Sequence, residues 1–297
     1  MSGHTGGGGE TRRVGQVKEV TSLANPVIKD IRALALKKYR DAEGAFMAEG
    51  LKLVIDALDL GWSIRTLVFA KSQRGNAAVE KAAARTVAAG GLVLEVPEKV
   101  LVAITRRDNP QAVLGVFSQR WAALSDIRPQ DGDVWVALDR VRDPGNLGTV
   151  IRTADAAGAK GVILVGETTD PYSLETVRAT MGSIFAVPVA RSSAEAFIAW
   201  KKAAKVRLVG THLKGSVDYR TPDYTKGPIV LLMGNEQQGL PDTLAAACDT
   251  LIRIPQAGRA DSLNLAVATG VALYEVRRPA LPPNSPIGGP AAEGKDI

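Results

Sequence analysis

The chain has 297 residues, of which 45% are apolar and 23% are charged, the composition of a globular protein with room for two ordinary domains. Its formal net charge of +6 fits a polyanionic partner, although many basic proteins bind no nucleic acid. With two histidines and one cysteine, the chain cannot build a multi-histidine or cysteine-rich metal site, and we expect no metal.

Targeting signals are not evident in the sequence. The first residues hold no apolar core of a signal peptide, and no apolar run reaches the roughly 18 residues that cross a bilayer. The single cysteine, Cys248, cannot form an internal disulfide, which agrees with a reducing compartment. We therefore expect a cytoplasmic protein that makes no contact with a membrane.

Shifts in composition divide the chain into five segments. The two ends are rich in glycine or proline and predict disordered tails. An interruption of the apolar periodicity around Pro129 and Gly132 predicts a linker between two α/β domains. The predicted segments are a tail, a smaller domain, the linker, a larger domain and a second tail, over residues 1–17, 18–121, 122–132, 133–278 and 279–297.

The smaller domain opens with a helical pattern in "SLANPVIKDIRALALKKYRDAEG", where Ile28, Ile31 and Leu34 recur at helical spacing. Basic residues occupy the other face. Four of them are predicted RNA contacts: Lys29, Arg32, Lys38 and Arg40. A solvated amphipathic face explains the same pattern and is the commoner case. Helices near 49–61 and 76–89, with strands at 64–70, 92–96 and 112–118, complete a small α/β layer.

The larger domain alternates strands and helices more clearly. Strands are predicted at 134–139, 161–166, 185–190, 206–213, 228–234 and 250–255, and helices at 146–158, 174–182, 194–204, 240–248 and 262–278. Near-continuous apolar strands are typical of a parallel sheet that is covered on both faces. Ligands of such sheets bind beyond the carboxyl ends of the strands.

Three of these strands lead into unusual loops. In "DPGNLGTVIR", Asn146 is predicted to cap a helix whose first turn contains Gly148. A glycine there costs about 1 kcal/mol against alanine, which makes sense if something approaches the backbone closely. Arg152 follows one turn later, where a surface pair with Asp155 is the alternative to a role at the loop.

The other two loops are "VLLMGNEQQGLPD", which carries Glu236, and "LIRIPQAGRADSLNLAVATG", where Ser262 is predicted to cap the last helix. Ordinary connections and caps explain each loop taken singly. Neither G-x-G-x-x-G nor G-x-x-x-x-G-K-[ST] is present, which disfavours a dinucleotide or nucleoside triphosphate site. The residues alone support a shared ligand crevice lined by these loops, with an arginine and a carboxylate.

Taken in order, the loops carry three motifs, and through them the chain resembles the SpoU (TrmH-like) branch of the SPOUT RNA methyltransferases. The motifs N-x-G-x-x-x-R, G-x-E-x-x-G and I-P-x-x-G…S-L-N are matched by Asn146, Gly148 and Arg152, by Gly234, Glu236 and Gly239, and by Ile254, Pro255, Gly258, Ser262, Leu263 and Asn264. The smaller domain resembles the substrate-binding domain often fused to such enzymes, through "SLANPVIKDIRAL", Arg40, Phe46, "EGLKLV" and "NPQAVLGV".

The resemblance implies methyl transfer from S-adenosylmethionine to a ribose 2′-hydroxyl in RNA, a homodimer, and a C-terminal trefoil knot in the parallel-sheet α/β domain. It assigns the catalytic group to Arg152, Asn146, Glu236, Ser262 and Asn264, and cofactor binding to Thr211, Gly234, Gly239, Ile254, Gly258 and Leu263. Because a guanidinium stays protonated in proteins, we expect Arg152 to bind a phosphate or to stabilise the developing alkoxide, with Glu236 or water as the proton acceptor.

Ribosomal RNA is favoured as the target because of the fused smaller domain. Transfer RNA, or methylation of a base within the same fold, is an alternative, since RNA shape across both domains sets specificity. A further alternative is an inactive RNA-binding or ribosome-assembly factor, against which the intact motif residues argue. Binding of S-adenosylmethionine separates the enzyme from the inactive factor.

Overall fold

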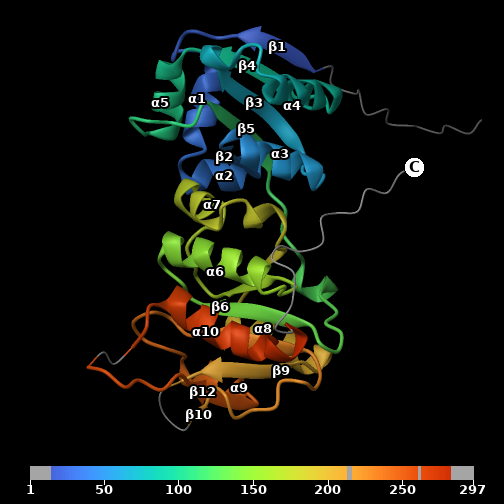
Figure 1. Cartoon of the computed structure of the whole chain (residues 1–297), viewed down its shortest axis with the longest axis vertical. Helices are drawn as coiled ribbons and strands as arrows, with labels where there is room; N and C mark the ends of the chain where they lie inside the picture. The colour runs from blue at the N-terminus through green and yellow to red at the C-terminus, as the bar shows by residue number, and fades with distance from the viewer. Residues whose placement is uncertain (1–14, 213–215, 260–261, 282–297) are drawn as a thin grey trace, which may run out of the picture. The chain divides into compact units, whose positions relative to one another are not determined.

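The computed structural model describes residues 15–212, 216–259 and 262–281, and the chain divides into two compact units, Met1–Gln119 and Arg120–Ile297 (Figure 1). Most of both predicted tails therefore lies outside the described residues. The predicted N-terminal tail extends too far, because Gln16–Glu19 form strand β1, which pairs with β4. Within the described ranges no helix is long and apolar enough to cross a membrane.

The first unit is built on a five-stranded sheet in the order β1-β4-β3-β5-β2. Strand β5 runs antiparallel to β2 and β3, while β1, β4 and β3 are parallel to one another. The elements are β1 (Gln16–Glu19), α1 (Pro26–Ala33), α2 (Lys37–Glu43), β2 (Ala45–Glu49), α3 (Leu51–Asp59), β3 (Ile64–Ala70), α4 (Ala77–Ala88), β4 (Leu92–Val96), α5 (Glu98–Thr105) and β5 (Val113–Ser118).

The predicted RNA contact at Arg40 is wrong. This side chain is 4% exposed, and its Nη1 donates to the carbonyl oxygens of Leu34 and Ala35 at 2.8 and 2.9 Å. Those carbonyls lie in the turn between α1 and α2, where the helical hydrogen bonds of α1 have ended. Arg40 therefore holds the turn between two helices, and its guanidinium is not available to RNA.

The second unit contains an all-parallel, seven-stranded sheet in the order β10-β12-β9-β11-β6-β7-β8. Its strands are β6 (Val134–Asp139), β7 (Val162–Val165), β8 (Val189–Ser192), β9 (Arg207–Thr211), β10 (Val217–Asp218), β11 (Ile229–Met233) and β12 (Thr250–Arg253). The chain adds β7 and β8 on one side of β6 and the later strands on the other. The boundary between β6 and β11 is thus the switch point, where open α/β sheets bind ligands.

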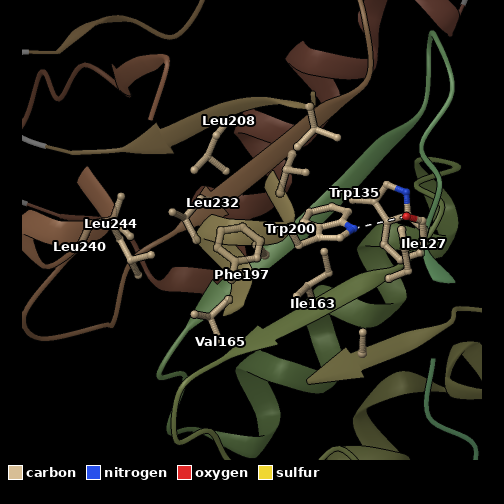
Figure 2. Close-up of a cluster of buried hydrophobic side chains, with 14 residues drawn as sticks. Ile127, Trp135, Ile163, Val165, Phe197, Trp200, Leu208, Leu232, Leu240 and Leu244 are labelled. Carbon is tan, nitrogen blue, oxygen red and sulfur yellow. Dashed lines mark hydrogen bonds between the residues drawn. The ribbon is translucent and has the colours of Figure 1, made fainter. Parts of the chain in front are cut away.

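Helices cover both faces of this sheet. They are α6 (Pro144–Ala156), α7 (Leu174–Thr180), α8 (Ala194–Ala204), α9 (Asp242–Ala247) and α10 (Leu265–Arg277). Figure 2 shows Phe197 and Trp200 of α8 and Leu244 of α9 packed on alternate strand residues such as Ile163 and Leu232. Helix α10 packs on β11, β6 and α6, and α7 packs on α6 (Figure 1).

The predicted linker at 122–132 is part of the second unit, which begins at Arg120. Ile127 belongs to the buried cluster, and its carbonyl accepts a hydrogen bond of 3.3 Å from Trp200 Nε1, drawn as a dashed line in Figure 2. Ala122 pairs in parallel with Ala190 of β8. Apolar residues within the polar segment therefore anchor it to the sheet.

Candidate active site

The three motif loops leave the sheet at the same edge. Strands β12, β9, β11 and β6 are parallel neighbours, so their carboxyl ends lie side by side. The register pairs Met233 at the end of β11 with Leu138 of β6, and Thr211 at the end of β9 with Ile252 of β12. The loops that follow β6, β11 and β12 therefore begin near one another, around the switch point.

A continuous chain of hydrogen bonds joins one side chain from each loop. Asn264 Nδ2 donates to Asn146 Oδ1 at 2.9 Å, and Asn146 Nδ2 donates to Glu236 Oε1 at 3.3 Å. The backbone amides of Arg142 and Asp143 also donate to Glu236 Oε1, at 3.4 and 3.5 Å. Residues of the three motifs are thus joined in one chain of hydrogen bonds that ends at the Glu236 carboxylate.

Helix α6 begins one turn earlier than predicted. Its cap is Asp143, whose Oδ1 accepts a hydrogen bond of 2.6 Å from the amide of Asn146. Pro144 follows as the first helical residue, a position that suits its fixed φ and missing N–H. The predicted cap at Asn146 is therefore wrong, and the Asn146 side chain is left to bind Glu236 and Asn264.

The close approach predicted at Gly148 comes from a neighbouring helix. A Cβ on Gly148 would lie 2.5 Å from Ala179 Cβ and 2.6 Å from the carbonyl oxygen of Thr176, both in α7. Gly148 is buried. This motif glycine therefore allows α6 and α7 to pack closely, and so fixes the helix that carries Asn146.

Helix α10 is capped by Asn264, so the predicted cap at Ser262 is wrong. Asn264 Oδ1 accepts from the amides of Ala266 and Val267 at 2.9 and 3.3 Å. The same side chain uses its Nδ2 to bind Asn146. Ser262 and Leu263 are exposed residues of the segment that leads into the helix. Asn264 therefore couples the start of α10 to the site.

The loop that carries Glu236 is closed on itself. Asn235 and Gly239 exchange two backbone hydrogen bonds of 3.2 and 2.9 Å, and Gly239 has a φ of +66°. A Cβ on Gly234 would lie 2.5 Å from the backbone of Gly239 and Leu240. Both motif glycines are therefore required by the tight turn, which fixes the position of Glu236.

Arg152 lies outside this chain of hydrogen bonds. It is exposed on α6, six residues after Asn146 and hence about 9 Å farther along the helix. In the described part of the chain its guanidinium makes no hydrogen bond or ion pair, so the alternative pairing with Asp155 is not formed. The cation is therefore available to an anionic partner.

The remaining predicted residues fall in two places. Thr211 ends β9, Ile254 follows β12, and Gly258 lies in the exposed loop beyond it. Lys29, Arg32 and Lys38 are exposed in the first unit.

The sequence analysis did not predict a role for Tyr39. This residue is 41% exposed, and Lys38 Nζ lies 4.8 Å from its ring centroid. An aromatic residue among lysines and arginines is a signal for stacking on nucleic acid bases.

No group of three or more His, Cys, Asp and Glu side chains within residues 15–212, 216–259 and 262–281 is arranged to hold a metal ion. The arrangement instead offers an ordered carboxylate, two amide side chains, backbone amides and nearby cations. Such a site can orient a polar substrate and accept a proton.

Comparisons with known proteins point to one family. The family model described as SpoU rRNA Methylase family matches residues 133–274, and the MRM3-like substrate binding domain matches residues 25–115. A crystal structure of an AdoMet-bound rRNA methyltransferase from Sinorhizobium meliloti is 69% identical, covers 90% of this chain and 99% of its own, and has a TM-score of 0.86.

Two curated relatives are similar over most of the chain. The 23S rRNA (guanosine(2553)-2′-O)-methyltransferase RlmP of Bacillus subtilis is 31% identical over 261 residues, which are 88% of this chain and 100% of the relative. The 23S rRNA (uridine(2479)-2′-O)-methyltransferase of Streptomyces viridochromogenes is 33% identical over 251 residues, 82% of this chain and 86% of the relative. Both relatives act on a ribose of 23S rRNA by name.

Proposed function

The chain belongs to the SpoU rRNA methylase family, and from this premise we propose that it transfers the methyl group of S-adenosylmethionine to a ribose 2′-hydroxyl of ribosomal RNA. The membership confirms the resemblance predicted from the three motifs. The observation that carries the proposal is the chain of hydrogen bonds from Asn264 through Asn146 to Glu236, which unites those motifs at one edge of the sheet. Ribosomal RNA is preferred to transfer RNA because the similar enzymes named above modify 23S rRNA.

The residues around β12 fit S-adenosylmethionine. Ile254 is half-buried and Leu263 is 38% exposed, so apolar side chains are available to the faces of an adenine ring. Among the described residues, none accepts a hydrogen bond from the backbone amides of residues 256–259, which can therefore pair with polar edges of a ligand. We assign cofactor binding to this loop together with Thr211 and the 234–240 turn.

In the proposed reaction the cofactor supplies an electrophilic methyl group on a sulfonium. Methyl transfer needs the ribose oxygen placed in line and a group to accept its proton. Asn146 and Asn264 orient the ribose together with Ser262, which precedes Asn264 by two residues. Glu236 Oε1, or a water, takes the 2′-hydroxyl proton. Arg152 binds the adjacent phosphate or stabilises the developing alkoxide by its charge.

The proposal includes a homodimer formed over α10. Four apolar side chains spaced along α10 and the segment before it are unusually exposed, with values of 38, 53, 36 and 49% for Leu263, Val267, Val271 and Tyr274. An exposed apolar face of this kind favours a protein partner. A Cβ on Gly270 would lie 3.7 Å from Thr153 Cγ2 of α6, so an interface over α10 would have Arg152 near its border.

The trefoil knot belongs to the proposal as well. Strand β12 lies beyond β9, whereas α10 packs on β11, β6 and α6. Asn264, at the start of α10, bonds to Asn146 in the loop after β6, and β9 and β11 lie between β12 and β6 in the sheet. These positions, with the 234–240 loop after β11, support a threaded path for the C-terminal part of the domain.

The first unit is proposed to hold the RNA through Lys29, Arg32 and Lys38, with Tyr39 as a stacking surface. Lysine and arginine neutralise phosphate charge, and an aromatic ring stacks on bases regardless of sequence. We place such an enzyme in the cytoplasm, because the similar enzymes named above come from bacteria.

Mass spectrometry of RNA fragments tests the proposal. Ribosomal and transfer RNA from cells with and without the gene are compared, and then unmodified RNA is incubated with the purified protein and S-adenosylmethionine. We expect one ribose methylation to disappear from ribosomal RNA in the deletion and to be restored in vitro, but not by Asn146→Ala. Methylation confined to transfer RNA, or a methyl group on a base, would contradict the proposed target or position. Lack of S-adenosylmethionine binding in calorimetry would favour the inactive factor.

A further inference from the structure

Arg140, the first residue after β6, has an unusual backbone conformation. Its φ of +47° lies in the left-handed region, which is unfavourable for a residue that carries a Cβ. Its amide donates to the carbonyl oxygen of Val165 at 2.9 Å. A Cβ on Gly166 would come within 3.1 Å of Arg140 Cγ, so the glycine at the end of β7 leaves room for the arginine stem.

The Arg140 guanidinium is anchored by a buried carboxylate. Nε lies 3.2 and 3.0 Å from the two oxygens of Asp139, and Nη2 lies 2.9 Å from Oδ2. Asp139 is 3% exposed, so this pairing satisfies a charge that would be costly to bury alone. The paired guanidinium points its Nη1 at the Glu236 loop, where it donates to Gln238 Oε1 at 2.9 Å.

The Arg140 backbone holds the same loop at a second point. Its carbonyl oxygen accepts a hydrogen bond of 2.8 Å from Asn235 Nδ2. Asn235 Oδ1 in turn accepts from the amides of Gln237 and Gln238 at 3.0 and 3.2 Å. Arg140 therefore holds the turn on both sides of Glu236, at Asn235 through its backbone and at Gln238 through its side chain.

We propose that Arg140 is a positioning residue for the methyl transfer, acting with Gln238 as a clasp that sets the place of the Glu236 carboxylate. This inference rests on the proposed function and extends it to Arg140, which precedes the first motif, and to Gln238, a position that the second motif leaves unspecified. The strained backbone directs the carbonyl and the guanidinium of one residue toward the same loop. Asn235 Nδ2 also lies 3.4 Å from Glu236 Oε2, which links the clasp to the carboxylate directly.

The substitution that isolates the clasp is Gln238→Ala, with Gln237→Ala as its matched control. Both glutamines are exposed neighbours in the turn, and within the described residues the Gln237 side chain makes no hydrogen bond. Hydrogen exchange of the amides of residues 237–239 is measured first, without cofactor or RNA. Loss of one hydrogen bond to a charged donor should speed exchange about tenfold in Gln238→Ala, and Gln237→Ala should match the parent protein.

The kinetic arm uses single-turnover methylation of ribosomal RNA at saturating S-adenosylmethionine. We expect Gln238→Ala to lower the rate about fivefold to tenfold with an unchanged RNA Kd, and Gln238→Glu, which keeps an acceptor oxygen, to restore it. Arg140→Lys keeps a charge beside Asp139 but cannot hold both partners. In that background, Gln238→Ala should change the rate less than twofold, because the clasp is already open.

Equal exchange in the Gln238→Ala and Gln237→Ala proteins would overturn the clasp, and so would rate losses from Arg140→Lys and Gln238→Ala that simply multiply. If the parent protein methylates no RNA ribose, the proposed function fails. The exchange measurement then decides separately whether Arg140 and Gln238 hold the turn.

Discussion

Asn264 and Asn146 are joined by a hydrogen bond of 2.9 Å although they are 118 positions apart in the sequence. The first lies at the start of α10 and the second in the first turn of α6. Because Asn264 also caps α10, the last helix cannot shift at its N-terminus without breaking a contact to the site. The C-terminal helix is thus part of the machinery that positions Glu236.

Two substitutions at Asn264 separate its roles as cap and as site residue. Asn264→Asp keeps an oxygen for the amides of Ala266 and Val267 but loses the Nδ2 donor to Asn146. Asn264→Ala loses both. We expect the free energy of unfolding to be unchanged for the aspartate and lower by about 1 kcal/mol for the alanine, while both lose methylation at least tenfold. Denaturant unfolding and methylation assays check this, and an active Asn264→Asp enzyme would contradict the role at the site.

Gly148 and Gly270 should respond in opposite directions to alanine. At Gly148 the new Cβ would meet Ala179 Cβ at 2.5 Å, so α6 and α7 must separate, at a cost of about 1–3 kcal/mol. At Gly270 the nearest atom is Thr153 Cγ2 at 3.7 Å, an ordinary contact, so alanine should stabilise α10 by up to about 1 kcal/mol. Thermal unfolding measures both, and destabilisation of similar size at the two positions would contradict this account.

The larger domain could be predicted well because its strands are continuous apolar runs between amphipathic helices. Helix α8 has the predicted bounds, since Ser193 caps it and Phe197 and Trp200 mark its buried face. The helices and strands of the smaller domain were harder to predict from the sequence. Strand β2 is buried along its whole length and shows no alternation, and the break between α1 and α2 depends on Arg40 binding carbonyls that periodicity does not reveal.

The three motif loops meet at one edge of the sheet, but the contacts of each side chain depend on competition between neighbours. Asp143 caps α6 because it precedes Pro144, which left Asn146 for the site. Asn264 caps α10 in place of Ser262. The partner of Gly148 is α7, and only the packing of the folded chain shows that.

The contribution of the Arg152 positive charge can be tested separately from that of the guanidinium shape. If the guanidinium binds a phosphate or stabilises the alkoxide, Arg152→Lys should keep a measurable fraction of the methylation rate, since lysine also binds phosphate as a point charge. Arg152→Ala should lose about a hundredfold or more. Stability should change little because the side chain is exposed on α6. Equal and complete loss of activity in both variants would leave the charge-only role without support.

The proposed dimer predicts a specific effect at Val271, which is 36% exposed on α10. Val271→Asp would bury a carboxylate in an apolar interface, so the dimer Kd should rise by about a hundredfold or more. The matched control is Val102→Asp, because Val102 is 37% exposed on α5 in the first unit. Sedimentation equilibrium distinguishes the outcomes. A parent protein that sediments as a monomer, or the same dissociation in both variants, contradicts an interface over α10.

The environment of Tyr172 predicts that the second unit loses folding stability at high pH. Its ring is 1% exposed, and its hydroxyl donates to the carbonyl oxygen of Arg120 and accepts from the Arg120 amide at 3.1 Å. Burial raises the pKa of Tyr172 to about 12. An unfolded tyrosine has a pKa of about 10, so the folded state disfavours ionisation. The stabilisation from the neutral hydroxyl is therefore fully present below about pH 10 and is lost as the pH rises toward 12.

The comparison that isolates this group is the parent protein against Tyr172→Phe. Below about pH 10, the phenylalanine should lower the free energy of unfolding by about 1 kcal/mol, because it removes the hydroxyl from Arg120. Between about pH 10 and pH 12 the parent should lose stability faster than the variant, by on the order of 2 kcal/mol, since only the parent has this phenol to ionise. Denaturant unfolding across this range measures the difference. A difference that stays constant to pH 12 would mean that the Tyr172 hydroxyl ionises as easily in the folded state as in the unfolded chain.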